Sequence, residues 1–324
     1  MTVEKILVSG ASGLLGANVC RIAVSQGRQV RGLVRKAADA EVLKKLGVEP
    51  ALGDICDPAS LARAMQGIDG VIHAAAVIGG TWSTATAQDF DAVNYHGVIN
   101  VLDAARAANV RRTVLISTLA IADRSFTITE NSPLIPVDSH GSGYAHAKLG
   151  SFYAGMHRAC RGEEIVFVLP GAMYGPSPFI DRALEPTLFT GTLYLALTGK
   201  LENYVHFPLT WPFVDDVAAV TLAALDKGKS GHRYLGGGRA EDAYSLAQFC
   251  NMACEYAGVA HRVRDLSLEE AGAEIGSMRH FAAMRVAEPP IDPTGTMRAL
   301  GVSFTPLREG IARTVDWLRA NDRI

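Results

Sequence analysis

The chain has 324 residues, which is more than a single domain usually contains, so one large core with an appended subdomain, or two domains, is expected. Of these residues 48% are hydrophobic and 20% are charged, proportions that are ordinary for a globular protein. A net charge of −2 offers no electrostatic attraction to nucleic acid or to an anionic membrane, and no apolar run approaches the ~18 residues that span a bilayer. The five cysteines are scattered and odd in number, which favours reduced thiols in a cytoplasmic protein. Cys250 and Cys254 share a helix face, but no second ligand pair accompanies them, so we expect buried hydrophobes and no metal site.

The chain opens with an apolar strand at residues 6–9, glycines at positions 10, 13 and 16, and then a helical pattern. Gly10 can adopt the positive φ of a tight turn, Gly13 lets a pyrophosphate approach the backbone, and Gly16 lets the helix pack closely on the strand. Strand, glycine turn and helix together predict a dinucleotide-binding βαβ unit, although the glycine spacing departs from the standard fingerprint. Amides at the start of the helix would face the phosphates. The expected contacts here are Gly10, Ser12, Gly13, Leu14, Leu15 and Gly16.

Strand and helix patterns then alternate along the first half of the chain. Strands are predicted at residues 29–34, 49–53, 70–73, 113–117 and 165–169, and helices at residues 38–46, 58–65, 90–108 and about 143–160. Strands at this spacing, separated by helices, require a parallel sheet that is covered on both faces. The sequence therefore predicts an α/β fold with a doubly wound parallel (Rossmann) sheet.

Beyond Pro170 this alternation breaks down, because proline and glycine become frequent and aromatic residues occur in loops. Residues 214–225 are predicted to form a helix and residues 233–235 a last strand, whereas the pattern from residue 245 onward is mostly helical and ends with residues 307–318. We expect a dinucleotide-binding domain of residues 1–170, to which residues 212–238 return. Residues 171–211 and 239–324 would form a smaller, discontinuous, mostly helical substrate-binding subdomain.

The end of the second predicted strand indicates which dinucleotide binds. Units that bind NAD usually carry an acidic residue there, which bonds the adenosine ribose 2′-hydroxyl. No Asp or Glu occurs between Gly16 and Arg35, and the strand ends in Arg35 and Lys36. This cation pair would attract a 2′-phosphate, so NADP is favoured over NAD, the alternative being a solvated surface pair. Further cofactor contacts are expected after the third and fourth strands, at Asp54, Ile55, Ala74, Ala75 and Ala76.

Tyr144 and Lys148 lie four residues apart in the helix after the fifth strand, hence on one face. A phenol with an unperturbed pKa of about 10 is a poor acid-base catalyst near neutrality. An ammonium about 4 Å away, at an effective dielectric of about 20, would lower that pKa by ~3, close to 7. The alternative is a structural tyrosine and a solvated lysine. Ser117 and Thr118 end the fifth strand, where a hydroxyl could hold a carbonyl oxygen or satisfy the backbone.

Several motifs occur in order between residues 10 and 217. They are Gly10-x-x-Gly13-x-x-Gly16, Gly53-Asp54, His73-Ala74-Ala75-Ala76, Asn94, Ser117-Thr118, Tyr144-x-x-x-Lys148, Pro170-Gly171, Tyr174-Gly175-Pro176 and Phe213-Val214-Asp215-Asp216-Val217. As a set they resemble the extended short-chain dehydrogenases/reductases, the superfamily that includes NAD-dependent epimerases/dehydratases, dihydroflavonol reductases and 3β-hydroxysteroid dehydrogenases.

The resemblance implies roles for individual residues. Tyr144 would be the general acid, Lys148 would also bond the nicotinamide ribose, and the third catalytic hydroxyl would be that of Thr118. Because this position is usually Ser, Ser117 is kept as the alternative. Asn94 is expected to brace the structure. Pairing through helices 90–108 and 144–160 is frequent in the family, so a homodimer is also implied. The nicotinamide would be lined by Pro170, Gly171 and Met173.

The residues after the sixth strand separate the branches of this family. Nucleotide-sugar enzymes carry an Asn there that holds the nucleotide phosphate, whereas this chain has Ala172. Aromatic residues would suit an apolar carbonyl compound, unless they form the subdomain core. These predicted substrate contacts are Tyr174, Phe207 and Trp211.

We therefore expect an NADPH-dependent oxidoreductase that transfers a hydride between nicotinamide and the carbonyl or alcohol of a small, largely apolar ketone or aldehyde. One alternative is a nucleotide-sugar epimerase or dehydratase with tightly held NAD. Another is a non-catalytic dinucleotide-sensing regulator, against which the intact pair of Tyr144 and Lys148 argues.

Overall fold

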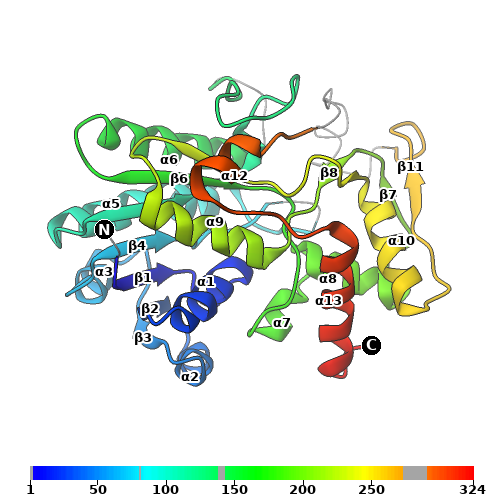
Figure 1. Ribbon diagram of the computed structural model, residues 1–324, viewed down its shortest axis with the longest axis horizontal. Helices are drawn as coiled ribbons and strands as arrows, with labels where there is room; N and C mark the ends of the chain where they lie inside the picture. Colours follow the sequence, from blue (N-terminus) through cyan, green and yellow to red (C-terminus); the bar gives the residue numbers. More distant parts are fainter. Residues whose placement is uncertain (1–2, 80–81, 138–142, 273–289) are drawn as a thin grey trace.

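The computed structural model describes residues 3–79, 82–137, 143–272 and 290–324. Within this part of the chain, seven parallel strands form one sheet in the order β3-β2-β1-β4-β5-β6-β9, with helices on both faces (Figure 1). The strands are β1 (Lys5–Ser9), β2 (Gln29–Val34), β3 (Glu49–Leu52), β4 (Gly70–His73), β5 (Arg112–Ile116), β6 (Ile165–Pro170) and β9 (Arg233–Gly236). The predicted doubly wound Rossmann sheet is confirmed.

Two sets of helices cover the sheet. One face carries α1 (Leu14–Ser25), α2 (Ala37–Lys45), α9 (Val214–Lys227) and α12 (Thr294–Leu300). The other face carries α3 (Pro58–Ala64), α5 (Gly97–Ala107) and α6 (Gly143–Ala159).

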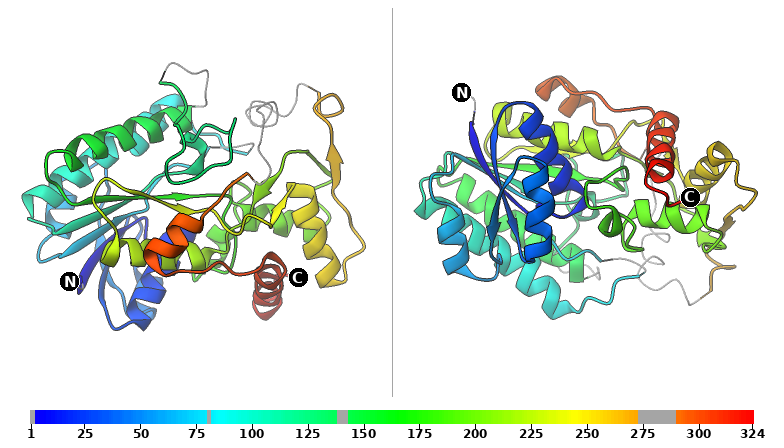
Figure 2. Two further views of the ribbon diagram at one scale, coloured as in Figure 1. Left: turned by 45° about the horizontal axis from the view of Figure 1, so that its top comes forward. Right: turned by 90° about the horizontal axis from the view of Figure 1, so that it is seen from below.

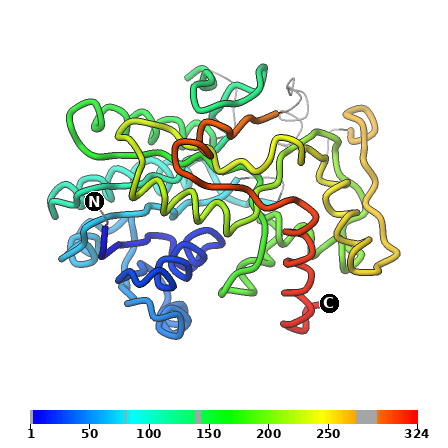
Figure 3. Tube along the Cα trace, in the orientation of Figure 1, coloured from blue at the N-terminus to red at the C-terminus, as the bar shows by residue number. Residues whose placement is uncertain are grey.

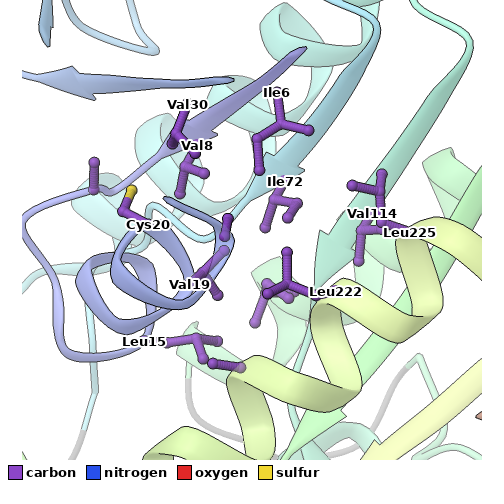
Figure 4. Packing of buried hydrophobic residues seen from close by; sticks show 14 of the residues in the cluster. Ile6, Val8, Leu15, Val19, Cys20, Val30, Ile72, Val114, Leu222 and Leu225 are labelled. Atoms are coloured by element: carbon purple, nitrogen blue, oxygen red, sulfur yellow. The ribbon is translucent and has the colours of Figure 1, made fainter. Parts of the chain in front are cut away.

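The central strand β1 shows why the sheet needs both layers. Ile6 and Val8 point to one face, where they pack with Leu15, Val19 and Leu222 of α1 and α9 (Figure 4). Leu7 points to the opposite face and belongs to the cluster formed by α3 and α5. Alternate side chains of a strand point to opposite faces, so a strand that is apolar throughout must be buried on both sides.

The register brings the carboxyl ends of the strands to one edge of the sheet. Ser9 at the end of β1 is in register with Leu33 of β2 and with His73 of β4. His73 is in register with Leu115 of β5, and Ile116 with Val168 of β6. The residues that follow these strands therefore gather along a single edge.

The helix predicted at residues 90–108 begins earlier than the sequence indicated. It starts with α4 (Ala87–Asp89), continues as the π-helix η1 (Phe90–His96) and ends as α5. The backbone N–H of Asp89 donates to the Thr86 hydroxyl at 3.2 Å, and the Asp89 carboxylate accepts from the Thr86 N–H at 2.8 Å. This capping box starts the helix ahead of its apolar face, which is why the periodicity misplaced its start.

A second core is formed by elements near the C-terminal helix, which Figures 2 and 3 place to one side of the sheet. Its elements are α7 (Ile180–Ala183), α8 (Phe189–Leu197), α10 (Leu246–Ala257) and α13 (Leu307–Ala320), with the short strands β7 (Asn203–Val205), β8 (Leu209–Thr210), β10 (Ala243–Tyr244) and β11 (Arg264–Leu266). Cys250 and Cys254 are fully buried in this core. The predicted domain boundaries stay a prediction. Across the described ranges, no helix combines the length and apolar character needed to cross a bilayer.

Candidate functional site

The residues predicted to contact a cofactor or to take part in catalysis include positions after six of the seven strands. They are Gly10 after β1, Arg35 and Lys36 after β2, Asp54 and Ile55 after β3, Ala74, Ala75 and Ala76 after β4, Ser117 and Thr118 after β5, and Gly171 and Met173 after β6, whose last residue is Pro170. Because the strands are parallel and in register, all of these positions lie at one edge of the sheet. This is the edge at which open α/β sheets bind their ligands.

The glycine turn after β1 has the shape that the sequence predicted. Gly10 has a φ of +71°, and a Cβ there would lie 2.6 Å from the backbone nitrogen of Ala75. A Cβ on Gly16 would overlap the carbonyl oxygen of Gly10. The predicted roles of Gly10 in the tight turn and of Gly16 in close packing are confirmed.

The start of α1 fits the pyrophosphate of a dinucleotide. The helix begins at Leu14 with no side-chain cap on its free amides and no acidic residue in its first turn. A Cβ on Gly13 would meet one atom, the Gly10 carbonyl oxygen at 3.2 Å, so the protein's own packing leaves room there. Free amides at the positive end of a twelve-residue helix form a suitable site for an anion.

Two buried polar side chains, those of Ser117 and His73, lie at this edge of the sheet. The Oγ of Ser117 lacks a hydrogen-bond partner in the described residues, and a polar group of a bound dinucleotide would satisfy it. His73 is 1% exposed, and its Nδ1 lies 2.7 Å from the Oγ of Ser9. Burial lowers the pKa of His73 to about 3, with a smaller contribution from the charge of Lys148, so the ring is neutral. His73 is therefore a buried core histidine.

Helix α6 brings the three predicted catalytic residues together at the end of β5. The Nζ of Lys148 donates a hydrogen bond of 2.7 Å to the carbonyl oxygen of Ile116, and the side chain is buried. One turn earlier, the phenol of Tyr144 is hydrogen-bonded to the side chain of Thr118. The hydroxyl of Thr118 also accepts from the N–H of Ala120 at 3.1 Å, which fixes its position.

The expected electrostatic effect on Tyr144 is corrected by the structure. Burial raises the pKa of Tyr144 to about 12, against the opposing effect of the Thr118 hydrogen bond. Burial also lowers the pKa of Lys148 to about 8. The helical spacing correctly placed both groups on one face. It could not show that burial opposes ionisation of the phenol, or that the ammonium is held by a backbone carbonyl.

Two residues that the sequence reasoning missed hold the ring of Tyr144 in place. The ring of Phe90 lies edge-on to it, with centroids 5.9 Å apart. The backbone of Gly79 packs closely against Tyr144. A Cβ on Gly79 would lie 2.9 Å from the Cβ of Tyr144. Asn94 braces the same segment by bonding both the N–H and the carbonyl oxygen of Val77, as predicted. In the sequence, only the glycine pair after the fourth strand could have indicated a close backbone contact at Gly79. No sequence pattern indicated that Phe90 contacts Tyr144.

Replacing Gly79 with alanine is expected to lower kcat by about 10- to 100-fold, because the new methyl group must displace Tyr144 and misplaced catalytic groups lose rates of this order. Steady-state kinetics and a thermal melt measure the effect. The control is Ile78→Ala at the neighbouring exposed side chain, which should keep kcat within about twofold. An unchanged kcat in Gly79→Ala would show that the contact does not position the phenol.

The cation pair predicted to bind a 2′-phosphate lies at the surface. Arg35 and Lys36 are both exposed, and neither forms an ion pair with any residue that the structure describes. Arg35 is near enough to Cys56 to lower the pKa of its thiol slightly, although burial and Asp54 raise that pKa overall. Arg35 therefore lies near the ends of both β2 and β3, where the adenosine ribose is expected, and Lys36 follows it in the chain.

The predicted substrate contacts are corrected. Tyr174 is 0% exposed, its hydroxyl donates to the carbonyl oxygen of Leu307, and its ring packs against Phe249. Trp211 is also buried and stacks on Phe249 with ring centroids 4.2 Å apart. Phe207 is buried in the same cluster. These aromatic residues form the core of the second subdomain, the alternative that composition alone could not exclude.

Comparison with known proteins adds the following. Residues 6–237 match the model of the NAD dependent epimerase/dehydratase family. Sterol demethylase protein B of Methylococcus capsulatus is 32% identical over 234 residues, which cover 71% of this chain and 68% of that protein. The 4-hydroxy-2-methyl-3-oxo-4-farnesyl-3,4-dihydroquinoline-1-oxide ketoreductase of Stigmatella aurantiaca is 30% identical over 241 residues, which cover 71% of this chain and 67% of that protein.

Solved structures share the fold over nearly the whole chain. The crystal structure of gox2253 has a TM-score of 0.83 at 24% identity and covers 99% of both chains. The dTDP-glucose 4,6-dehydratase DesIV of Streptomyces venezuelae, solved with NAD and TYD bound, has a TM-score of 0.79 at 24% identity and covers 98% of this chain and 97% of that chain. At these identities the likeness supports the fold alone.

Proposed function

The chain is a member of the NAD-dependent epimerase/dehydratase family, and we propose that within this family it is an NADPH-dependent reductase of small carbonyl compounds, working as an alcohol dehydrogenase in the reverse direction. As a family member it is a nicotinamide-dinucleotide-dependent oxidoreductase. The observation that carries the proposal is that Thr118, Tyr144 and Lys148 meet at the carboxyl end of β5, on the same edge of the sheet as the glycine turn after β1.

Each of the three residues has a distinct task. A reduced dinucleotide, held at the glycine turn of Gly10, Gly13 and Gly16, would supply the hydride. The Thr118 hydroxyl, fixed by the Ala120 amide, donates a hydrogen bond to the substrate oxygen and stabilises its developing negative charge. Tyr144, which keeps its proton because burial raises its pKa, delivers that proton to the same oxygen. Lys148, held by the Ile116 carbonyl, provides the positive charge that stabilises the phenolate left behind.

Three further points support the choice of cofactor and branch. Arg35 and Lys36 are exposed and available for a 2′-phosphate. Ala172 is buried at the position where nucleotide-sugar enzymes carry the phosphate-binding Asn, and it cannot make that bond. The relative from Stigmatella aurantiaca is named as a ketoreductase.

The test is NADPH and NADH oxidation over a panel of aldehydes and ketones, followed by a search for copurified dinucleotide and for UDP-sugar binding. The proposal predicts turnover of NADPH with carbonyl compounds and stoichiometric alcohol formation. Tightly held oxidised NAD with UDP-sugar binding would instead favour an epimerase or dehydratase. Dinucleotide binding without any turnover would favour a regulator.

The double variant Arg35→Ser and Lys36→Ser removes the cation pair. It is expected to raise KM for NADPH by about 30-fold or more and to leave KM for NADH within about twofold. The reason is that the variant lacks two charge-assisted contacts to the 2′-phosphate, which NADH does not carry. Steady-state kinetics with both cofactors measure this change. The matched control is Lys44→Ser with Lys45→Ser on the exposed face of α2, which alters the net charge equally. Equal losses in the two double variants would show that only the overall charge matters.

The pH dependence of reduction should report Lys148. Its pKa is lowered to about 8 by burial, so the ammonium is present below pH 8 and is lost as the pH rises through that value. The phenol, with a pKa raised to about 12, stays protonated throughout this range. We therefore expect kcat/KM at saturating NADPH to be level below about pH 7 and to fall about tenfold per pH unit well above pH 8. A profile that stays level to pH 10 would contradict this role of Lys148.

A further inference from the structure

The buried histidine at the edge of the sheet has one ring nitrogen that the described residues leave unpaired. His73 ends β4 and is 1% exposed, and its Nδ1 shares a hydrogen bond of 2.7 Å with the Oγ of Ser9 at the end of β1. Its Nε2 is also buried and has no hydrogen-bond partner among the described residues. Buried polar atoms without a partner are uncommon in native proteins, so the surroundings of Nε2 must account for it.

The register of the sheet brings this imidazole close to Lys148. Strand β4 lies between β1 and β5. His73 is in register with Leu115 of β5, and the next residue of that strand, Ile116, accepts the hydrogen bond from the Lys148 Nζ. Burial lowers the pKa of His73 to about 3, and the charge of Lys148 contributes to this shift. A neutral imidazole and a buried ammonium are therefore close enough to interact.

The two tautomers of His73 differ in what they present to that charge. If Nδ1 carries the proton, it donates to the Ser9 oxygen, and Nε2 keeps a lone pair. If Nε2 carries the proton, a buried N–H is left without an acceptor, and its positive end is repelled by the ammonium. A lone pair near a cation is stabilised by the charge, so the first tautomer explains how the unpaired Nε2 is tolerated.

The ammonium of Lys148 has few other groups to stabilise it. Burial lowers its pKa to about 8, and its acceptor is the carbonyl oxygen of Ile116. Tyr144, one turn earlier on α6, is neutral because burial raises its pKa to about 12. In the described part of the chain, no carboxylate contributes to the pKa of Lys148 or of His73. The dipole of a neutral imidazole can therefore influence this cation measurably.

We propose that His73 is a positioning residue for Lys148: Ser9 holds the ring as the tautomer with a proton on Nδ1, and the Nε2 lone pair stabilises the ammonium. This inference rests on the task that the proposed reductase gives to Lys148. Ser9 and His73 end neighbouring strands and are in register, so the sheet itself fixes the ring. Loss of the lone pair makes the ammonium easier to deprotonate, which narrows the pH range of full activity.

Two variants of His73 separate its two nitrogens. Asparagine places its amide near the position of Nδ1 and keeps a partner for Ser9, but it has no atom at the position of Nε2. Glutamine is one methylene longer and brings an amide oxygen to that position. In His73→Asn, we expect the fall of kcat/KM at saturating NADPH to begin about 0.5 to 1 pH unit lower than in the wild type, the size of one interaction with a neutral polar group.

His73→Gln should recover most of this shift, because its amide oxygen replaces the lone pair. The matched control is His157→Asn, the same substitution at an exposed histidine on the helix that carries Lys148. It should leave the pH profile in place. A thermal melt and NADPH affinity establish that each variant is folded. A profile in His73→Asn that coincides with the wild type would overturn the proposal.

The tautomer can be measured without any substrate, by nuclear magnetic resonance of protein labelled with ¹⁵N in its histidines. The signal that is lost in His73→Asn belongs to His73. It should show a protonated Nδ1 and an unprotonated Nε2, and it should not change between about pH 5 and pH 9, because the ring titrates far below this range. A proton on Nε2, or titration near neutral pH, would contradict the proposal.

Failure of this inference differs from failure of the proposed function. If carbonyl reduction proceeds but its pH profile is the same in His73→Asn, the positioning role is wrong while the reductase stands. If no carbonyl compound consumes NADPH, the reductase function fails, and the ¹³Cε signal of Lys148, assigned with Lys148→Met, then reports its titration directly. A midpoint that is lower by about 0.5 pH unit or more in His73→Asn supports the inference, whereas an equal midpoint overturns it.

Ser9→Ala keeps the inference testable if His73→Asn does not fold. This variant removes the hydrogen bond that fixes the tautomer and leaves the ring itself in place. We expect part of the His73 signal to change to the form with a proton on Nε2, and the titration midpoint of Lys148 to fall. An unchanged tautomer together with an unchanged midpoint would overturn the proposal.

Discussion

Replacing Tyr144 with phenylalanine is expected to lower kcat for carbonyl reduction by roughly 10³-fold, within the range that a positioned proton donor contributes. The variant keeps the ring that packs edge-on to Phe90 and against Gly79, and it loses only the hydroxyl bonded to Thr118. Folding and NADPH affinity should therefore stay close to those of the wild type. Single-turnover NADPH oxidation measures the chemical step, and fluorescence titration measures cofactor binding.

Tyr153→Phe provides the matched control for this change. Tyr153 lies on the same helix α6 but is 45% exposed, so its variant should retain kcat within about twofold. Thr118→Val removes the other hydroxyl and should lower kcat by about 10²-fold, as the loss of a single oxyanion donor does. Substantial turnover in Tyr144→Phe, with Thr118→Val unaffected, would contradict the assigned chemistry.

Replacing Gly16 with alanine is expected to lower the free energy of unfolding by about 3 kcal/mol. The added methyl group would overlap the Gly10 carbonyl oxygen and lie 3.2 Å from the Cα of Ala11. Both are backbone atoms of the turn, so no side-chain rotation relieves the contact and α1 must move away from β1. That movement opens the core that α1 shares with α9. Urea unfolding at equilibrium measures the loss.

Gly13→Ala separates folding from cofactor binding. The φ of Gly13 is −79°, which alanine adopts readily, and its Cβ would lie 3.2 Å from a single oxygen atom. The stability loss should stay below about 1 kcal/mol. Dinucleotide affinity should nevertheless fall by about tenfold or more, because the pyrophosphate is expected to approach the backbone here. Equal stability losses in the two glycine variants would contradict the different roles given to them.

Much of the fold and the placement of several site residues followed from local patterns. Residues 6–16 predicted a strand, a turn and a helix because the positive φ of Gly10 and the close contact at Gly16 are local demands that few other residues satisfy. The alternation of strands and helices required a parallel sheet, and a parallel sheet places the residues after its strands at one edge. The spacing of Tyr144 and Lys148 likewise placed them on one helix face.

Other features depend on segments that are distant in sequence. Tyr174 and Trp211 could have lined a substrate site or a core, and only the packing of Phe249 against both rings decided for the core. The pKa of Tyr144 depends on burial, which no spacing rule contains.

The sequence by itself thus determined the dinucleotide-binding part of the fold. There, the periodicity of strands and helices and the backbone angles of the glycine turn depend on neighbouring residues. The surroundings of Tyr144, including the ring of Phe90 and the backbone of Gly79, arose only when segments distant in sequence met. Desolvation depends on all atoms nearby in space, and the chain brings most of them from far away.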